Sequence, residues 1–99
     1  MALVTSFAFA QGVTTSSISG QVTDETGEPL PGATVVAVHE PTGTTYGAAA
    51  DFDGFFRISG MRSGGPYRIS FSYVGFETDT RTQFFLTLGR TSTLSVDLA

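Results

Sequence analysis

From Ser17 onward, the chain alternates short runs rich in β-branched and aromatic residues with clusters of Gly, Pro and Asp. Such runs predict β-strands when apolar and polar residues alternate, because successive side chains of a strand point to opposite faces. No segment keeps a helical period. The runs comprise residues 17–23, 33–39, 44–50, 55–59, 67–73, 77–83, 84–88 and 91–98. These eight runs correspond to about seven strands, and we therefore predict an all-β fold, a seven-stranded antiparallel β-sandwich.

Several runs carry a more specific expectation. Residues 33–39 are apolar on both faces, which predicts a central strand. Residues 67–73 alternate most regularly, and residues 77–83 mix Thr with charged residues, which is typical of a protected edge strand. We expect residues 84–88 and 91–98 to pair with each other around Gly89-Arg90.

The N-terminal segment differs from the rest of the chain. Residues 2–10 are mostly apolar and end in Ala8-Phe9-Ala10, the small-x-small pattern that a signal peptidase accepts. We predict a signal-peptide remnant at residues 1–10, a leader at 11–16 and one folded domain at 17–98. No apolar run is long enough to span a bilayer, so the chain is expected to be exported without a membrane span of its own.

Composition restricts the chemistry that is open to this chain. Its 99 residues correspond to one domain, and they include one His, no Cys and no Lys. A Cys/His zinc site within one chain, a Schiff-base lysine and a P-loop lysine are therefore excluded. The net charge of −4 disfavours nucleic acid and anionic membranes as partners. We expect no cofactor and no enzymatic activity.

The segment Asp51-Phe52-Asp53-Gly54 is the best candidate for a metal site. Alternating carboxylates before a Gly open many calcium loops, but no carboxylate follows at the bidentate position and a strand begins directly at Phe55. We interpret the segment as a hairpin turn in which Asp53 and Gly54 take positive φ, and we predict no metal ligands.

Two other segments invite a catalytic interpretation. His39 could act as a base, but the adjacent Glu40 points to the opposite face of the strand, so we expect an exposed residue at the end of a strand. Residues 60–66 form a predicted glycine-rich loop, which neither a Lys nor a helix follows, so it is no phosphate cradle. We predict no catalytic residues.

Aromatic residues are numerous, and not all of them can face a core. Exposed rings could stack on sugars or mark a protein interface. The absence of Trp favours an interdomain contact surface over a sugar platform. The rings in question are Tyr46, Phe52, Phe55, Phe84 and Phe85.

Residues 18–24, Ile-Ser-Gly-Gln-Val-Thr-Asp, and 27–35, Gly-Glu-Pro-Leu-Pro-Gly-Ala-Thr-Val, resemble the opening of carboxypeptidase-regulatory-like domains. The similarity continues through Thr42-Gly43 and through residues 51–56, 67–76 and 94–98, in the same order. It implies the transthyretin-like, or prealbumin-like, seven-stranded sandwich. Ala50 departs from the family pattern, which often has Thr at that position.

The form Tyr73-Val74-Gly75-Phe76, behind a signal peptide, is most similar to the N-terminal extension of TonB-dependent outer-membrane receptors, including the SusC-like and Oar-like groups. The resemblance implies an accessory domain on the periplasmic side of the outer membrane of a Gram-negative bacterium. There it would act as a spacer or docking module, with the plug and barrel of the same receptor and the TonB energising system as partners.

The resemblance also implies motif residues with a structural role, in which backbone geometry sets the requirement. They are Gly20, Pro31, Gly32, Asp53, Gly54, Tyr73, Gly75 and Phe76. Two other functions stay open: an adhesive module that binds carbohydrate or another surface polymer, and an accessory domain of a secreted hydrolase. The adhesive module would need a row of exposed aromatic rings on one face.

Overall fold

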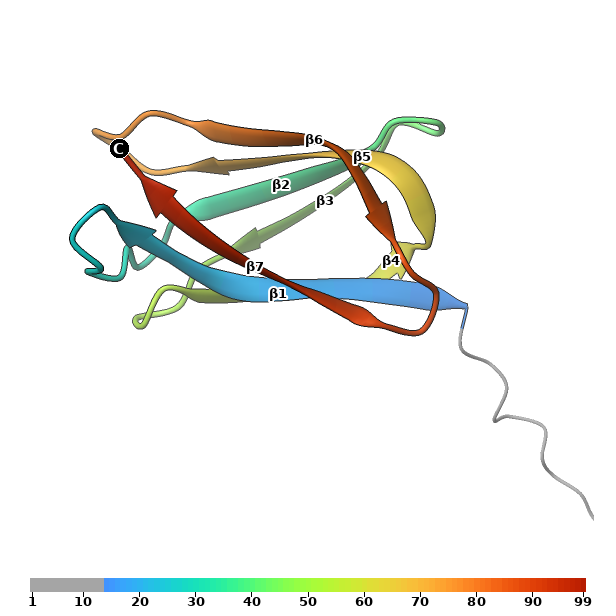
Figure 1. The fold of residues 1–99 in the computed structure, drawn as a ribbon, viewed down its shortest axis with the longest axis horizontal. Helices are drawn as coiled ribbons and strands as arrows, with labels where there is room; N and C mark the ends of the chain where they lie inside the picture. The colour runs from blue at the N-terminus through green and yellow to red at the C-terminus, as the bar shows by residue number, and fades with distance from the viewer. Residues whose placement is uncertain (1–13) are drawn as a thin grey trace, which may run out of the picture.

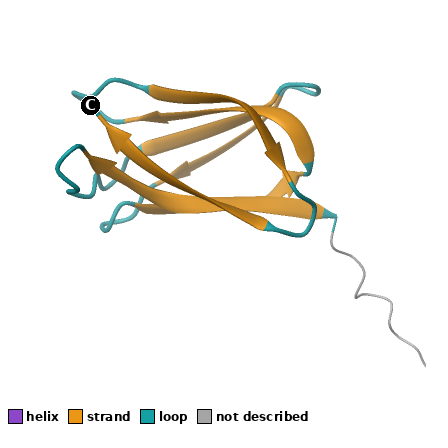
Figure 2. Cartoon of the chain, viewed as in Figure 1, coloured by secondary structure: helices purple, strands orange, loops and turns teal. Residues whose placement is uncertain are grey.

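The computed structural model describes residues 14–99, which form seven β-strands and no helix (Figure 2). None of these residues therefore belongs to a helix that could cross a membrane. The expected signal-peptide remnant and residues 11–13 of the expected leader lie outside the described residues, whereas Thr15 and Ser16 of that leader begin the first strand. The strands are β1 (Thr15–Asp24), β2 (Thr34–His39), β3 (Thr44–Ala49), β4 (Phe55–Arg62), β5 (Gly64–Ser72), β6 (Asp79–Leu86) and β7 (Thr91–Leu98).

The strands form two sheets that face each other, with the strand orders β4-β1-β7 and β3-β2-β5-β6 (Figure 1). The predicted seven-stranded sandwich is thereby confirmed, as are the central position of β2 and the edge position of β6. One pair differs from the rest, because β7 runs parallel to β1. The parallel pair arises because β6 lies in the other sheet, so the chain crosses between sheets before β7 begins.

Two expected local features were wrong. Residues 84–86 continue β6 and pair with β5, so they form no hairpin with β7. Instead, the connection at residues 87–90 is held to the start of β1, where Ser16 Oγ donates to Thr87 O at 2.8 Å and Gly89 N donates to Thr15 O at 3.0 Å. The predicted loop at residues 60–66 is also largely strand. Met61 is fully buried in the core, and β4 therefore continues to Arg62.

Alternating side chains from both sheets fill the space between the layers. Burial of each large apolar side chain contributes about 1.5–3 kcal/mol, which is the main source of stability. The rings of Phe56 and Phe71 meet between the sheets, with centroids 5.6 Å apart. The fully buried side chains include Ile18, Val22, Val35, Met61, Tyr67, Ile69, Phe71 and Val96.

Gly20 lies in the middle of β1, where this strand is paired on both sides, with β4 and with β7. A Cβ atom built on Gly20 would overlap the carbonyl oxygen of Leu94. Only glycine allows the backbone of β7 to approach β1 this closely. Gly20 therefore acts through the space that it leaves and not through an unusual φ.

The two ends of the sandwich differ. Residues 25–33, 50–54 and 73–78 connect strands at one end, where β7 also finishes at Ala99; we call this the loop end (Figure 1). Thr15 begins β1 at the opposite end, which also holds the turn at residues 40–43 and the connection at 87–90. Because β1 and β7 are parallel, the domain is entered and left at opposite ends, roughly 30 Å apart for a strand of this length.

The substitution Gly20→Ala is expected to lower the free energy of unfolding by about 3 kcal/mol, because the new methyl group forces β1 and β7 apart. Urea unfolding followed by circular dichroism measures this loss. Gly47→Ala is the matched control, since a Cβ there meets Val35 O at an ordinary 3.7 Å. The control should change stability by less than about 1 kcal/mol. Equal losses in both variants would contradict the close-approach argument.

Candidate functional site

Two turns at the loop end have the same construction. Each turn begins with an Asp and ends with the residue that follows a Gly. The N–H of the Asp donates to the carbonyl of that last residue, from Asp24 to Glu28 and from Asp51 to Phe55, both at 2.9 Å. The Asp24 carboxylate accepts from the N–H groups of Thr26 (2.8 Å) and Glu28 (3.0 Å). Asp51 accepts in the same way from Asp53 and Phe55, both at 2.9 Å. The carboxylates thus replace water as acceptors for these turns.

The Asp51 turn packs against β1 through its backbone. Val22 N donates to Gly54 O at 2.8 Å, and the Gln21 side chain donates to Asp53 O at 2.8 Å. Gly54 has φ 80°, and a Cβ there would lie 2.5 Å from Val22 O, so glycine is required twice over. The predicted turn is present, but Asp53 does not take positive φ as expected; Gly54 alone does. A type I geometry followed by one left-handed residue explains the difference.

The carboxylates of Asp24 and Asp51 are directed to the backbone of their own turns. Within residues 14–99, no group of three or more His, Asp or Glu side chains is arranged to hold a metal ion. Asp51 and Asp53, the metal candidates considered from the sequence, belong to the turn.

Negative charge gathers at this end of the molecule. Eight of the nine acidic residues lie in the loop end or within two residues of it. The ninth, Glu40, lies at the opposite end, where it pairs with Arg68 beside Arg62 and Arg90. The sandwich is therefore electrically polar along its length. The acidic residues of the loop end are Asp24, Glu25, Glu28, Asp51, Asp53, Glu77, Asp79 and Asp97.

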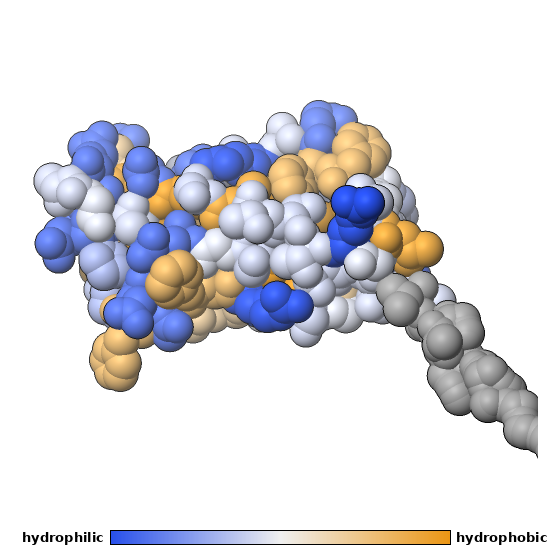
Figure 3. All heavy atoms as spheres, turned by 60° about the horizontal axis from the view of Figure 1, so that its bottom comes forward, coloured by the Kyte–Doolittle hydropathy of each residue, from blue (hydrophilic) through white to orange (hydrophobic). Residues whose placement is uncertain are grey.

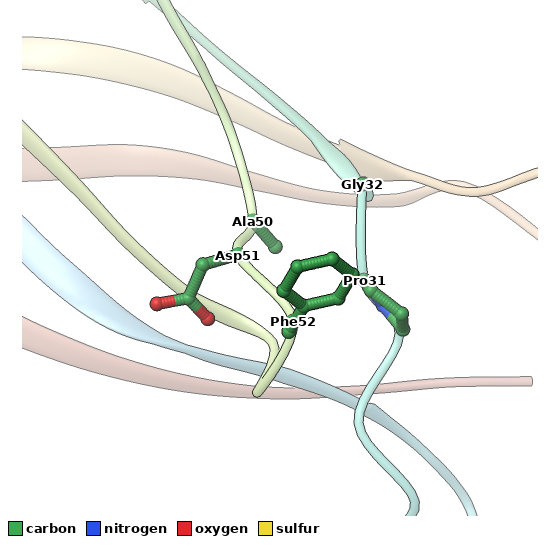
Figure 4. A pocket seen from close by; sticks show the side chains of 5 residues that line it. All are labelled: Pro31, Gly32, Ala50, Asp51 and Phe52. Atoms are coloured by element: carbon green, nitrogen blue, oxygen red, sulfur yellow. The ribbon is translucent and has the colours of Figure 1, made fainter.

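Apolar side chains project from the same acidic surface (Figure 3). Phe52 and Val74 are 90% and 92% exposed, more than any other large apolar residue described. An open hollow of about 440 Å³ is lined by Pro31, Gly32, Ala50, Asp51 and Phe52. In Figure 4, the Phe52 ring extends toward Pro31 while the Asp51 carboxylate points away from it. Exposed apolar groups within a polar rim are typical of contact surfaces.

The aromatic residues expected to be exposed divide into two groups. Phe52, Phe55 and Phe85 are exposed, whereas Tyr46 and Phe84 are partly buried and pack against the core. The row of exposed rings that a sugar platform requires is therefore interrupted.

The predicted motif residues are spread over the fold and do not form one site. Gly32 and Gly75 have positive φ in turns of the loop end, and Pro31 lines the hollow. Tyr73 and Phe76 close the β5–β6 turn, with a 3.0 Å bond from Phe76 N to Tyr73 O and ring centroids 5.8 Å apart. Their structural role stays a prediction, which the Gly20 variant tests in part.

His39 occupies a different environment from the one expected. It is 7% exposed, not an exposed strand end, and its ring meets the Tyr67 ring edge-to-face at 5.0 Å. Nδ1 lies 2.8 Å from Thr42 Oγ1. The Tyr67 hydroxyl donates to Arg62 O at 2.6 Å, and Arg62 N donates to Tyr46 OH. Burial, together with the neighbouring Tyr46, raises the pKa of Tyr67 to about 12.

Sequence reasoning considered each segment of the loop end separately and missed their combination. The repeated pattern Asp-x-x-Gly, at Asp24 and again at Asp51, was a visible signal of two matching turns. The gathering of charge and exposed Phe52 at one end depends on strand directions, which no single segment reveals.

Comparison with known proteins gives one family. Residues 17–99 match the sequence model of the carboxypeptidase regulatory-like domain. The TonB-dependent receptor SusC of Bacteroides thetaiotaomicron is 41% identical over 70 residues, which cover 71% of this chain and 6% of that receptor. The chain thus spans a small part of the length of this relative.

Solved structures share the fold at low identity. A chlorocatechol 1,2-dioxygenase from Pseudomonas putida superposes with a TM-score of 0.69 at 15% identity, covering 86% of this chain and 60% of the enzyme. A putative carbohydrate binding protein from Bacteroides uniformis gives 0.65 at 18% identity, covering 84% of this chain and 40% of that protein. At these identities, the likeness shows the fold alone.

The dioxygenase neighbours correct one expectation. We predicted no enzymatic activity from the small size and the residue types of the chain, but enzymes are among the proteins that contain this sandwich. That prediction is therefore contradicted, and neither the size of the domain nor its fold is a ground for excluding catalysis.

In Asp24→Asn, the free energy of unfolding is expected to fall less steeply as the pH is lowered into the acidic range. Hydrogen bonds from Thr26 and from the backbone at Glu28 lower the pKa of Asp24 below its ordinary 3.8, so its contribution is present above that pH and is lost as pH falls through the lowered value. Urea midpoints between neutral and strongly acidic pH measure the effect. Glu25→Gln, which removes a neighbouring carboxylate, is the control; an unchanged acid limb in Asp24→Asn would contradict the role of these bonds.

Tyr67→Phe is expected to cost about 1 kcal/mol near neutral pH, because the bond to Arg62 O is lost. In the parent chain, the raised pKa favours the neutral phenol in the fold, so this contribution is complete below pH 10 and declines as pH rises toward about 12. Ultraviolet titration of the three tyrosines should lose its most alkaline step in the variant. Tyr73→Phe is the control, and loss of the same step from it would reassign the titration.

Proposed function

This chain belongs to the carboxypeptidase regulatory-like domain family, and on that premise we propose that it is a periplasmic accessory domain of a TonB-dependent outer-membrane receptor. The observation that carries the proposal is the 41% identity over 70 residues to SusC, a TonB-dependent receptor. In this proposal, residues 1–10 are the remnant of a signal peptide, residues 11–16 are a leader, and residues 17–98 are the domain.

The directions of β1 and β7 support a role as a spacer. Since the two strands are parallel, an incoming chain and an outgoing chain are held roughly 30 Å apart by the rigid sandwich. A hairpin-closed domain, with both termini at one end, would add bulk without adding distance. Here, any segment joined to β7 starts from the loop end.

The loop end supports a docking role. It combines the two most exposed large apolar side chains, Phe52 and Val74, with eight acidic residues. The plug and barrel of the same receptor, which would follow β7 in the chain, are the nearest candidate partners, and the TonB energising system is the next. Docking would fix the direction in which the domain projects into the periplasm.

Removing residues 17–98 from the complete receptor tests the proposal. We expect the deletion to reduce TonB-dependent uptake at least severalfold while the barrel still assembles in the outer membrane. Replacement by an unrelated sandwich, with termini at opposite ends, should restore uptake if spacing suffices. Unchanged uptake after deletion would contradict both roles.

The double variant Phe52→Ser/Val74→Ser separates docking from spacing in the same receptor. A loss of uptake with full expression indicates docking, because exposed positions contribute little to folding. Thr93→Ser, an exposed change on β7, is the matched control. Full uptake by the double variant would exclude docking through this surface and leave the spacer role.

A further inference from the structure

Strand β3 is an unusually open edge of the four-stranded sheet. It pairs with β2 on one side, over six residues without a register shift, and no strand within residues 14–99 lies on its other side. Among the edge strands described, β3 alone carries no charged residue, whereas β4, β6 and β7 contain Arg57, Arg81 and Asp97. Charges and irregularities are the usual protection of an edge against pairing, and β3 has neither.

The hydrogen-bond pattern identifies the free backbone groups of β3. Ala50 N donates to Ala33 O at 2.8 Å and Ala50 O accepts from Gly32 N at 2.9 Å, so both backbone groups of Ala50 face the β2 side, as in a hydrogen-bonded pair. Because such pairs alternate in an antiparallel ladder, Ala48 and Tyr46 also bond to β2. The N–H and C=O groups of Thr45, Gly47 and Ala49 therefore point outward from the sheet. All three residues are exposed.

We propose that β3 pairs in antiparallel fashion with β3 of a second copy of this chain, around a two-fold axis at Gly47. All three outward-pointing residues find partners when Thr45 lies opposite Ala49 of the second copy and Gly47 lies opposite its own equivalent. Any other antiparallel centre within the strand either joins groups already bonded to β2 or shortens the paired segment. The product is a continuous eight-stranded sheet.

The side chains along this edge suit self-pairing. The exposed residues that oppose each other are Thr45 with Ala49 and Gly47 with Gly47, and on the core side Tyr46 faces the small Ala48, so no like charges meet across the strands. A partner strand of different sequence could form the same backbone bonds, but the polarity of the sandwich favours a second copy.

Antiparallel pairing brings unlike ends together. The acidic loop end of one copy then lies beside the opposite end of its partner, where Arg62, Arg68 and Arg90 are located. Parallel pairing, which would join two acidic ends, is disfavoured.

The interface is small, so the association is weak. A six-residue strand from each copy buries less surface than the interfaces of stable complexes do. We therefore expect a dissociation constant of about 0.1–1 mM for the free chain. This association does not depend on the proposed receptor function, and it concerns a different surface from the docking hollow.

Sedimentation equilibrium of the 99-residue chain, up to about 1 mM, tests the association. We expect a reversible dimer, together with concentration-dependent hydrogen-exchange protection of the Thr45, Gly47 and Ala49 amides. A chain that stays monomeric over this range, or protection confined to other strands, would overturn the proposal.

A charge exchange tests the register. The double variant Thr45→Lys/Ala49→Lys places like charges opposite each other and should weaken the dimer at least tenfold, although it lowers the net negative charge. Mixing it with Thr45→Glu/Ala49→Glu should restore association as a heterodimer. Thr91→Lys/Thr93→Lys on exposed β7 is the control, with the same charge change and unaltered dimerisation. If mixing fails to restore association, the proposed register is wrong.

Discussion

The closeness of β1 and β7 at Gly20 is the contact on which the rest of the sandwich depends. It allows a parallel pair to form at the point where β1 is also bound to β4, so that three strands share one line of contact. The parallel direction of β7 then fixes where the domain is left and which end carries the three long connections. A single absent side chain therefore sets both the packing of one sheet and the orientation of the whole module.

Much of the fold could be predicted from the sequence because period-two alternation survives in most strands. Residues 67–73 are the clearest case: Tyr67, Ile69 and Phe71 are all buried. The prediction failed where the pairing partner of a strand depends on segments that are distant in the sequence. Residues 84–88 looked like the partner of β7, but Leu86 faces the core as the end of β6. Met61 shows the same limit, since its glycine-rich neighbours suggested a loop.

The candidate site was less predictable than the fold, for a physical reason. Exposure is decided by what packs nearby in three dimensions, and identical residue types therefore separate: Phe52 is almost fully exposed and Phe56 is buried four residues later. His39 shows the opposite error, because its burial depends on Tyr67 from a strand that lies far along the chain. Only strand directions reveal that acidic loops distant in sequence gather at one end.

The two Asp-x-x-Gly turns satisfy their own backbone groups, and this has an evolutionary consequence. The residue that follows the Asp, Glu25 in one turn and Phe52 in the other, is exposed to solvent while the carboxylate and the glycine hold the turn closed. Those positions can change without disturbing the sandwich. Such a scaffold lets related domains diversify what they touch, and lets an engineer change it, at two positions that the fold does not need.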